Sequence, residues 1–200
     1  MNILRILISV VVLGFGSVAS AGELVQNGGF EVSGFNHWSG TAVSDSVNGV
    51  GGSFSGLSPY AGNKQAHFLN DVSETISQSL STTVNGSETI SFALADVAGD
   101  SGDSFKVYFG GTLLATISNP GSGYKTYSYN ATATSASTNL SFTFVQNTGA
   151  WALDAVSVTE STGAVVPVVP EPSTFTLAWV ACVSGLGNAM FHRRKAKFAA

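Results

Sequence analysis

Short runs of alternating apolar and polar residues recur through residues 22–160 and leave little room for helices. In 89–97 (TISFALADV) the side chains of Ile90, Phe92 and Leu94 share one phase, with smaller or polar residues between them. A period of two places every second side chain on the same face of a β-strand. The segment is therefore predicted to be all-β, with strands that have one packed face and one wet face.

Glycine, asparagine and aspartate separate these runs at regular spacing. The runs span 64–69, 74–80, 89–97, 104–109, 113–117, 124–129, 140–145 and 151–158. Gly110-Gly111 lies between two of them and predicts a two-residue hairpin turn. Many short strands with turn signals between them predict an antiparallel β-sandwich or jelly roll for residues 22–160.

Charge is scarce and unevenly placed. Charged residues make up 10% of the chain, against about 25% in ordinary soluble domains. Residues 22–170 carry a net charge of −8, whereas residues 171–200 carry +3. This balance excludes a nucleic-acid binder, and a single cysteine excludes an internal disulfide scaffold.

The first 21 residues have the features of a secretory signal peptide. Arg5 precedes an apolar run, and small residues end the segment at Ala19-Ser20-Ala21. A basic start, a short apolar core and an A-x-A site predict export with cleavage after Ala21. The alternative is a buried N-terminal helix or strand.

Residues 173–191 form a second apolar segment and contain no charged residue. A helix of 19 residues is roughly 28 Å long, close to the ~30 Å hydrocarbon core of a bilayer. A basic tail, 192–200, follows and is expected to stay cytoplasmic. A linker, 161–172, joins this predicted transmembrane helix to the β-domain.

This C-terminal arrangement resembles the PEP-CTERM sorting signal of Gram-negative bacterial envelope proteins. The matching residues are Val169, Pro170, Glu171, Pro172 and Ser173 before the span, and Arg193, Arg194 and Lys195 after it. The resemblance implies a membrane exosortase as partner, removal of the tail, and a destination at the cell surface or in the extracellular polysaccharide matrix. A plain single-pass anchor is the alternative.

Residues 24–31 (LVQNGGFE), 35–38 (FNHW) and 153–158 (LDAVSV) resemble galactose-binding-like jelly rolls, which include carbohydrate-binding modules. The resemblance implies a structural Ca²⁺ with Glu31 and Asp154 as ligands. No other cofactor is expected. Alternatively, both are turn or edge residues that accept backbone N–H bonds. Ala155 stands where the family usually has a second acid.

Exposed aromatic residues are candidates for stacking on a sugar. They are Trp38, Tyr60, Trp151 and the run Tyr124, Tyr127 and Tyr129. Core packing is the alternative for both tryptophans. Tyr127 and Tyr129 are expected to have opposite phases on their strand, so the three tyrosines are not expected to face one groove.

A further acidic segment carries Asp96, Asp100 and Asp103 but lacks the spacing of an EF-hand, so a hairpin loop is expected there. No catalytic motif is present in the sequence, and an enzyme is not expected. The main hypothesis is an exported, non-catalytic surface or matrix protein associated with exopolysaccharide. The alternatives are a carbohydrate-binding module that uses Trp38 and Tyr60, and a structural, adhesion or ice-binding protein.

Overall fold

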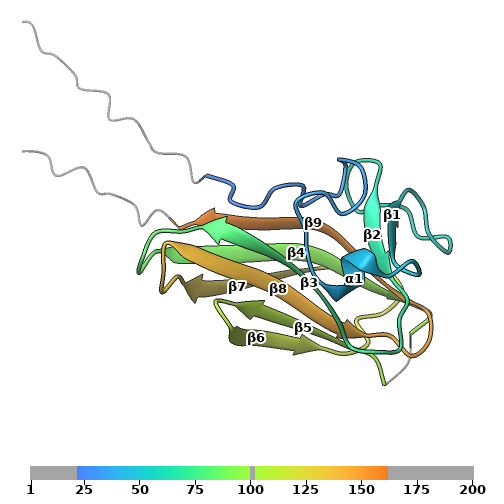
Figure 1. Ribbon diagram of the computed structural model, residues 1–200. Helices are drawn as coiled ribbons and strands as arrows, with labels where there is room; N and C mark the ends of the chain where they lie inside the picture. The colour runs from blue at the N-terminus through green and yellow to red at the C-terminus, as the bar shows by residue number, and fades with distance from the viewer. Residues whose placement is uncertain (1–21, 100–101, 162–200) are drawn as a thin grey trace, which may run out of the picture. The chain divides into compact units, whose positions relative to one another are not determined.

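A computed structural model describes residues 22–99 and 102–161, in which the alternating runs form strands (Figure 1). The elements are α1 (Thr41–Ser44), β1 (Gly49–Gly51), β2 (Gln65–Phe68), β3 (Glu74–Ser81), β4 (Ser87–Val97), β5 (Ser104–Phe109), β6 (Thr112–Ile117), β7 (Lys125–Thr132), β8 (Ser137–Val145) and β9 (Ala150–Glu160). Each of the eight runs predicted from the sequence overlaps one strand. The short strand β1 was not predicted.

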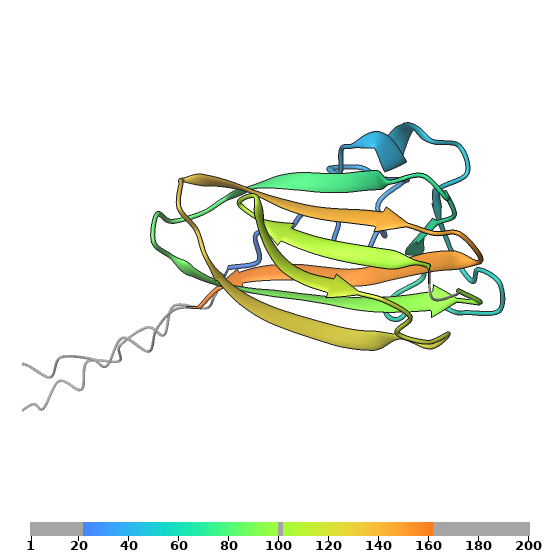
Figure 2. The same cartoon turned by 90° about the horizontal axis from the view of Figure 1, so that it is seen from below.

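The strands form two antiparallel sheets that face each other (Figure 2). One sheet has the order β1-β2-β9-β4-β7, and the other has the order β3-β8-β5-β6. Most neighbours in space are therefore not neighbours in sequence, as in a jelly roll. The prediction of an all-β antiparallel sandwich is confirmed.

The hairpin between β5 and β6 is also as predicted. Phe109 pairs with Thr112, and Gly110 and Gly111 have φ angles of 58° and 81°. Two consecutive left-handed residues give the turn twist that matches the twist of the flanking strands, and glycine adopts them without steric cost.

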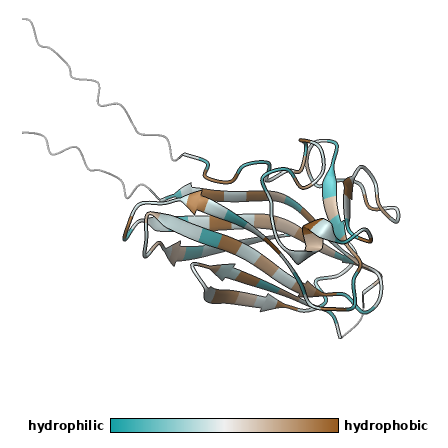
Figure 3. Ribbon diagram, in the orientation of Figure 1, coloured by the Kyte–Doolittle hydropathy of each residue, from teal (hydrophilic) through white to brown (hydrophobic). Residues whose placement is uncertain are grey.

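Aromatic side chains fill the space between the sheets. Phe142 packs 5.3 Å from Phe92 and 5.4 Å from Phe105 between ring centroids, and Phe105 lies 5.4 Å from Trp151. All four side chains are buried. The colouring in Figure 3 shows apolar residues alternating with polar ones along the strands, so the opposite phase of each strand faces outward.

The N-terminal segment lies along β9. Leu24 N–H donates to Val158 O, and Val156 N–H donates to Gly28 O, both at 2.9 Å. A Cβ on residue 28 would lie 1.8 Å from Val156 O, so only glycine allows this close approach.

Four predicted features lie outside the described residues. They are the signal peptide with its cleavage at Ala21, the sorting motif around Pro170-Glu171-Pro172, the helix 173–191, and the basic tail with Arg193, Arg194 and Lys195. Within residues 22–99 and 102–161, no helix has the length and apolarity needed to cross a membrane.

Candidate functional site

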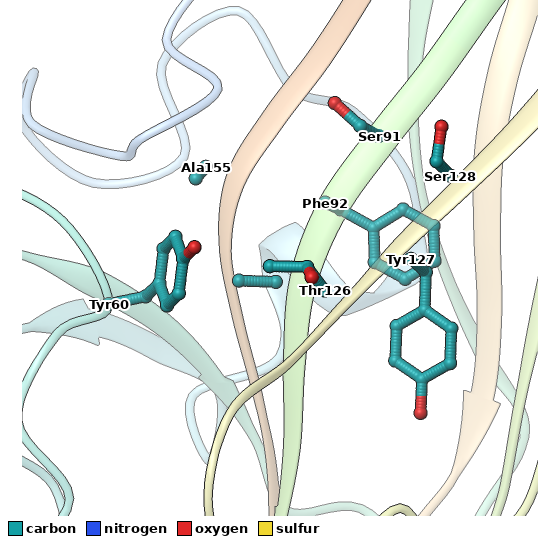
Figure 4. Close-up of a pocket in the computed structure, with 8 residues that line it drawn as sticks. Tyr60, Ser91, Phe92, Thr126, Tyr127, Ser128 and Ala155 are labelled. Atoms are coloured by element: carbon teal, nitrogen blue, oxygen red, sulfur yellow. The ribbon is translucent and has the colours of Figure 1, made fainter.

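A hollow of about 350 Å³ opens on the outer face of the five-stranded sheet. It is lined by Tyr60, Ser91, Phe92, Ala93, Thr126, Tyr127, Ser128 and Ala155. Figure 4 shows Tyr60 beside Thr126 and Ala155, and shows the hydroxyls of Ser91 and Ser128 pointing away from the rings of Phe92 and Tyr127. The hollow therefore combines one exposed aromatic ring with several hydroxyl groups.

Strand pairing explains why small side chains form the floor of the hollow, which consists of Ser91, Ala93, Thr126 and Ser128. In the β4–β7 ladder, Ser91 pairs with Ser128 and Ala93 pairs with Thr126. These positions alternate with Phe92, which is 2% exposed and turned to the core. Small residues therefore gather on the outward phase of two adjacent strands, where bulky side chains would fill the hollow.

A β-bulge shapes the same floor. The β4–β9 register shifts between Ser91 and Ala93, and Ala155 in β9 has a φ of 50°. A bulge bends its strand and increases the local twist. The bend lies at the hollow, where Ala155 forms part of the lining.

Tyr60 supplies the exposed ring. Its side chain is 49% exposed, and its ring packs edge-on against Tyr124 with centroids 5.6 Å apart. It belongs to the loop between β1 and β2, residues 52–64, and we call the part before Lys64 the 52–63 loop. The position of Tyr60 therefore depends on how that loop is held to the sheet.

Gln65 holds one part of the 52–63 loop. This side chain is fully buried, and its Nε2 donates to Gly52 O at 2.8 Å and to Leu57 O at 2.9 Å. The Tyr124 hydroxyl donates to Gln65 Oε1. Burial, and to a lesser extent the charge of Asp154, raises the pKa of Tyr124, so its hydroxyl stays protonated and acts as a donor.

Two carboxylates hold the end of the loop. Ala61 N–H donates to Asp154 Oδ2 at 3.0 Å. The N–H groups of Asn63 and Lys64 donate to Glu31 Oε1 at 2.7 and 2.9 Å. The residue next to Tyr60 is thus bonded to a fully buried aspartate in β9.

The two carboxylates have opposite pKa shifts. The N–H groups of Lys64 and Asn63 stabilise the Glu31 carboxylate and lower its pKa. Burial raises the pKa of Asp154, and the N–H groups of Ala61, Ala155 and Tyr60 oppose that rise in part. The negative charge of Glu31 also raises the pKa of Asp154, as the smallest of these effects.

The calcium site at Glu31 and Asp154 stays a prediction. The donor chemistry fits Ca²⁺, since a cation would relieve the repulsion between the two carboxylates, and each oxygen can keep its N–H bond on a second lone pair. The described residues contain no group of three or more His, Cys, Asp or Glu side chains that could hold a metal ion. Main-chain oxygens or water would therefore complete the ligand set.

The structure separates the aromatic candidates. Trp38 is 5% exposed, stacks on Phe30 with centroids 5.7 Å apart, and donates from Nε1 to Asn27 O at 3.2 Å. Its ring faces are therefore in the core and not available to a ligand, and Trp151 is fully buried as well. Core packing, the alternative considered for both, describes their positions.

The tyrosine run divides between the two faces of its strand. The expectation that Tyr127 and Tyr129 have opposite phases is wrong, because residues two apart in a strand share a face. Both rings stack on Phe92, on the inner side of β7. Tyr124 lies on the outer side, against Tyr60. The floor residues Ser91, Ala93, Thr126 and Ser128 were not predicted from the sequence. Their shared outward phase is visible in the sequence, but the pairing of β4 with β7 is not.

No protein-family model matches the sequence, and no curated protein matches it. Solved structures do resemble the fold. The module TmCBM61, determined in complex with β-1,4-galactotriose, is 16% identical with a TM-score of 0.55, over 70% of this chain and 99% of that one. A family 16 carbohydrate-binding module is 14% identical with a TM-score of 0.53, over 68% and 99%.

A third structure contains a similar module within an enzyme. It comprises the CBM22-1 and GH10 modules of a Clostridium thermocellum xylanase complexed with xylohexaose, and it is 15% identical with a TM-score of 0.52. The match covers 73% of this chain and 30% of that chain. The described domain thus has a fold that is also found in carbohydrate-binding modules.

Proposed function

We propose that the β-sandwich is a non-catalytic module that binds a glycan in the hollow on the outer face of the five-stranded sheet. The observation that carries this proposal is the half-exposed Tyr60 ring held over a floor of hydroxyl-bearing side chains. The fold, shared with modules that were solved bound to galactotriose and xylohexaose, supports it.

The chemistry of the hollow matches that of a sugar. An aromatic face can cover the apolar C–H face of a pyranose ring, while Ser91, Thr126 and Ser128 offer hydroxyl donors and acceptors to the sugar hydroxyls. The residues that line the hollow include no carboxylate, and glycoside hydrolysis ordinarily uses two. The lining therefore favours binding over cleavage.

Preorganisation supports the same function. Tyr60 stands between loop residues that are bonded to Gln65 and Asp154, so little conformational entropy is lost when a ligand packs against its ring. The net charge of −8 on residues 22–170 opposes an anionic polysaccharide. We therefore propose a neutral glycan as the ligand class.

The sorting hypothesis remains part of the proposal. Export by the signal peptide, followed by recognition of the Pro170-Glu171-Pro172 segment by an exosortase, would deliver the module to the cell surface or extracellular matrix of a Gram-negative bacterium. Membrane anchoring by residues 173–191 would be a transient stage. A module that binds neutral glycan suits a destination rich in exopolysaccharide.

The test is affinity electrophoresis of the purified full-length chain in gels that contain β-1,4-galactan, β-1,4-xylan or alginate. We expect at least one neutral polysaccharide to retard the protein and the anionic alginate not to retard it. Equal mobility in every gel would contradict the proposal and would favour the structural or adhesion role.

A further inference from the structure

A second polar cluster, distinct from the hollow, closes one end of the sandwich. Asp96 lies near the end of β4, Asp103 precedes β5, and Gln146 follows β8. The three side chains are 2%, 1% and 1% exposed. The end of β4, the start of β5 and the end of β8 lie at the same end of the molecule in Figures 1 and 2.

Three oxygen atoms surround a single nitrogen in this cluster. Gln146 Nε2 lies 3.1 Å from Asp96 Oδ1 and 2.8 Å from Asp103 Oδ2, and it also contacts Thr148 O. An amide nitrogen has only two hydrogens, so it cannot donate fully to three acceptors. The position at Nε2 is therefore an oxygen-lined point between two buried carboxylates.

The oxygen atom of the Gln146 amide provides a second, independent observation. This atom, Oε1, is buried and has no hydrogen-bond partner. Leaving a buried acceptor unsatisfied costs about 1–3 kcal/mol, and such groups are rare in folded proteins. A half-turn of the amide would exchange Nε2 and Oε1, but it would place a fourth oxygen beside the three already there, which is favourable only beside a cation.

We propose that this cluster is a binding site for a divalent cation, with Ca²⁺ the best fit. The ligands are the carboxylates of Asp96 and Asp103, the carbonyl oxygen of Thr148, and Gln146 Oε1 after rotation of its amide. All are hard oxygen donors, which suit Ca²⁺, whereas zinc sites ordinarily draw on thiolate or imidazole. Water would complete the six to eight ligands that Ca²⁺ takes.

The cation would join the two sheets. Asp96 belongs to the five-stranded sheet, whereas Asp103 and Gln146 directly flank β5 and β8 of the four-stranded sheet. The cluster also differs from the pair Glu31 and Asp154. In the β4–β9 ladder Asp96 pairs with Trp151 and Asp154 pairs with Ala93, so the two places are three residues apart, or about 10 Å along the strand.

The experiment measures the melting temperature of the full-length chain in chelator and in 10 mM CaCl₂, in a Glu31→Gln background that removes the other predicted calcium ligand. Ca²⁺ sites of extracellular modules have Kd values of about 0.1–1 mM. We therefore expect 10 mM Ca²⁺ to raise the melting temperature by about 4–8 °C. No rise in this background would overturn the proposal.

Two further variants locate the site. Adding Asp103→Asn should abolish the rise, whereas Asp71→Asn, at an exposed loop aspartate, should leave it intact. Gln146→Glu adds a third carboxylate, so it should lower the melting temperature in chelator and enlarge the rise in Ca²⁺. A loss in Gln146→Glu that Ca²⁺ does not recover, or a rise that Asp71→Asn also abolishes, would refute the site.

Discussion

Glu88 is a buried acid that faces another acid. Its side chain is fully buried in β4, neither carboxylate oxygen has a hydrogen-bond partner, and it pairs with Glu160 across the β4–β9 ladder. Burial raises the pKa of Glu88, and the charge of Glu160 raises it further. A carboxyl group whose pKa is higher in the folded state favours folding while it is protonated. Its contribution to stability is complete below the unfolded-state pKa and is lost as the pH rises through the folded-state pKa.

Replacing Glu88 with Gln should therefore stabilise the protein at pH 7. We expect a gain of about 1 kcal/mol, because the substitution removes an uncompensated buried charge and keeps the shape of the side chain. The gain should disappear below pH 4, where Glu88 is protonated. Chemical denaturation at both pH values measures the difference, and an equal effect at the two values would contradict the assignment of the charge.

At the scale of elements, the 52–63 loop converts a plain sheet surface into the hollow. Gln65, Tyr124 and Asp154 all hold it or its neighbours, and they come from β2, the segment before β7, and β9. The loop thus depends on residues that are far apart in the sequence. Its docking on the sheet is what places Tyr60 beside the floor.

Gln65→Leu should release the 52–63 loop. The variant loses the hydrogen bonds to Gly52 O, Leu57 O and the Tyr124 hydroxyl, so we expect a cost of about 2–3 kcal/mol and at least tenfold weaker glycan binding. Gln78→Leu is the matched control, because Gln78 is also buried and holds the main chain of Gln26. It should lose similar stability while glycan affinity stays unchanged, and equal losses of affinity in both would contradict a positioning role for Gln65.

These elements also show what sequence alone predicts. The strands could be predicted because the alternation of apolar and polar residues is a local pattern. The Gly110-Gly111 turn could be predicted because its backbone conformation depends only on those two residues. Strand β1 was missed, since its three residues include two glycines and have no readable period. The hollow was missed because it depends on which strands become neighbours and on the docking of the 52–63 loop. Of its lining residues, only Tyr60 and Tyr127 were among the aromatic candidates.

At the scale of the whole molecule, the described domain differs in composition from the segments that we propose direct its export and sorting. The described domain packs a core of aromatic and aliphatic side chains between two sheets and has hydroxyl groups on the outer face at the hollow. The sequences before and after it are apolar over short stretches and end in small or basic residues. We propose that the signal peptide and the C-terminal tail have both been removed by the time the domain reaches its destination.

Intact mass of the protein recovered outside the cell tests this sequence of events. In a host with an exosortase, we expect a chain that begins at Gly22 and lacks residues 175–200. A Glu171→Ala variant should retain its tail and stay with the membrane. Recovery of the exported protein with residues 175–200 still attached would contradict removal of the tail.

The central claim is that Tyr60 and the hollow beside it bind a neutral glycan. Affinity electrophoresis of Tyr60→Ala against Tyr108→Ala tests it most directly, because Tyr108 is an outward tyrosine on the four-stranded sheet, away from the hollow. We expect at least tenfold weaker retardation for Tyr60→Ala, with an unchanged melting temperature, and wild-type retardation for Tyr108→Ala. Wild-type retardation of Tyr60→Ala would contradict it.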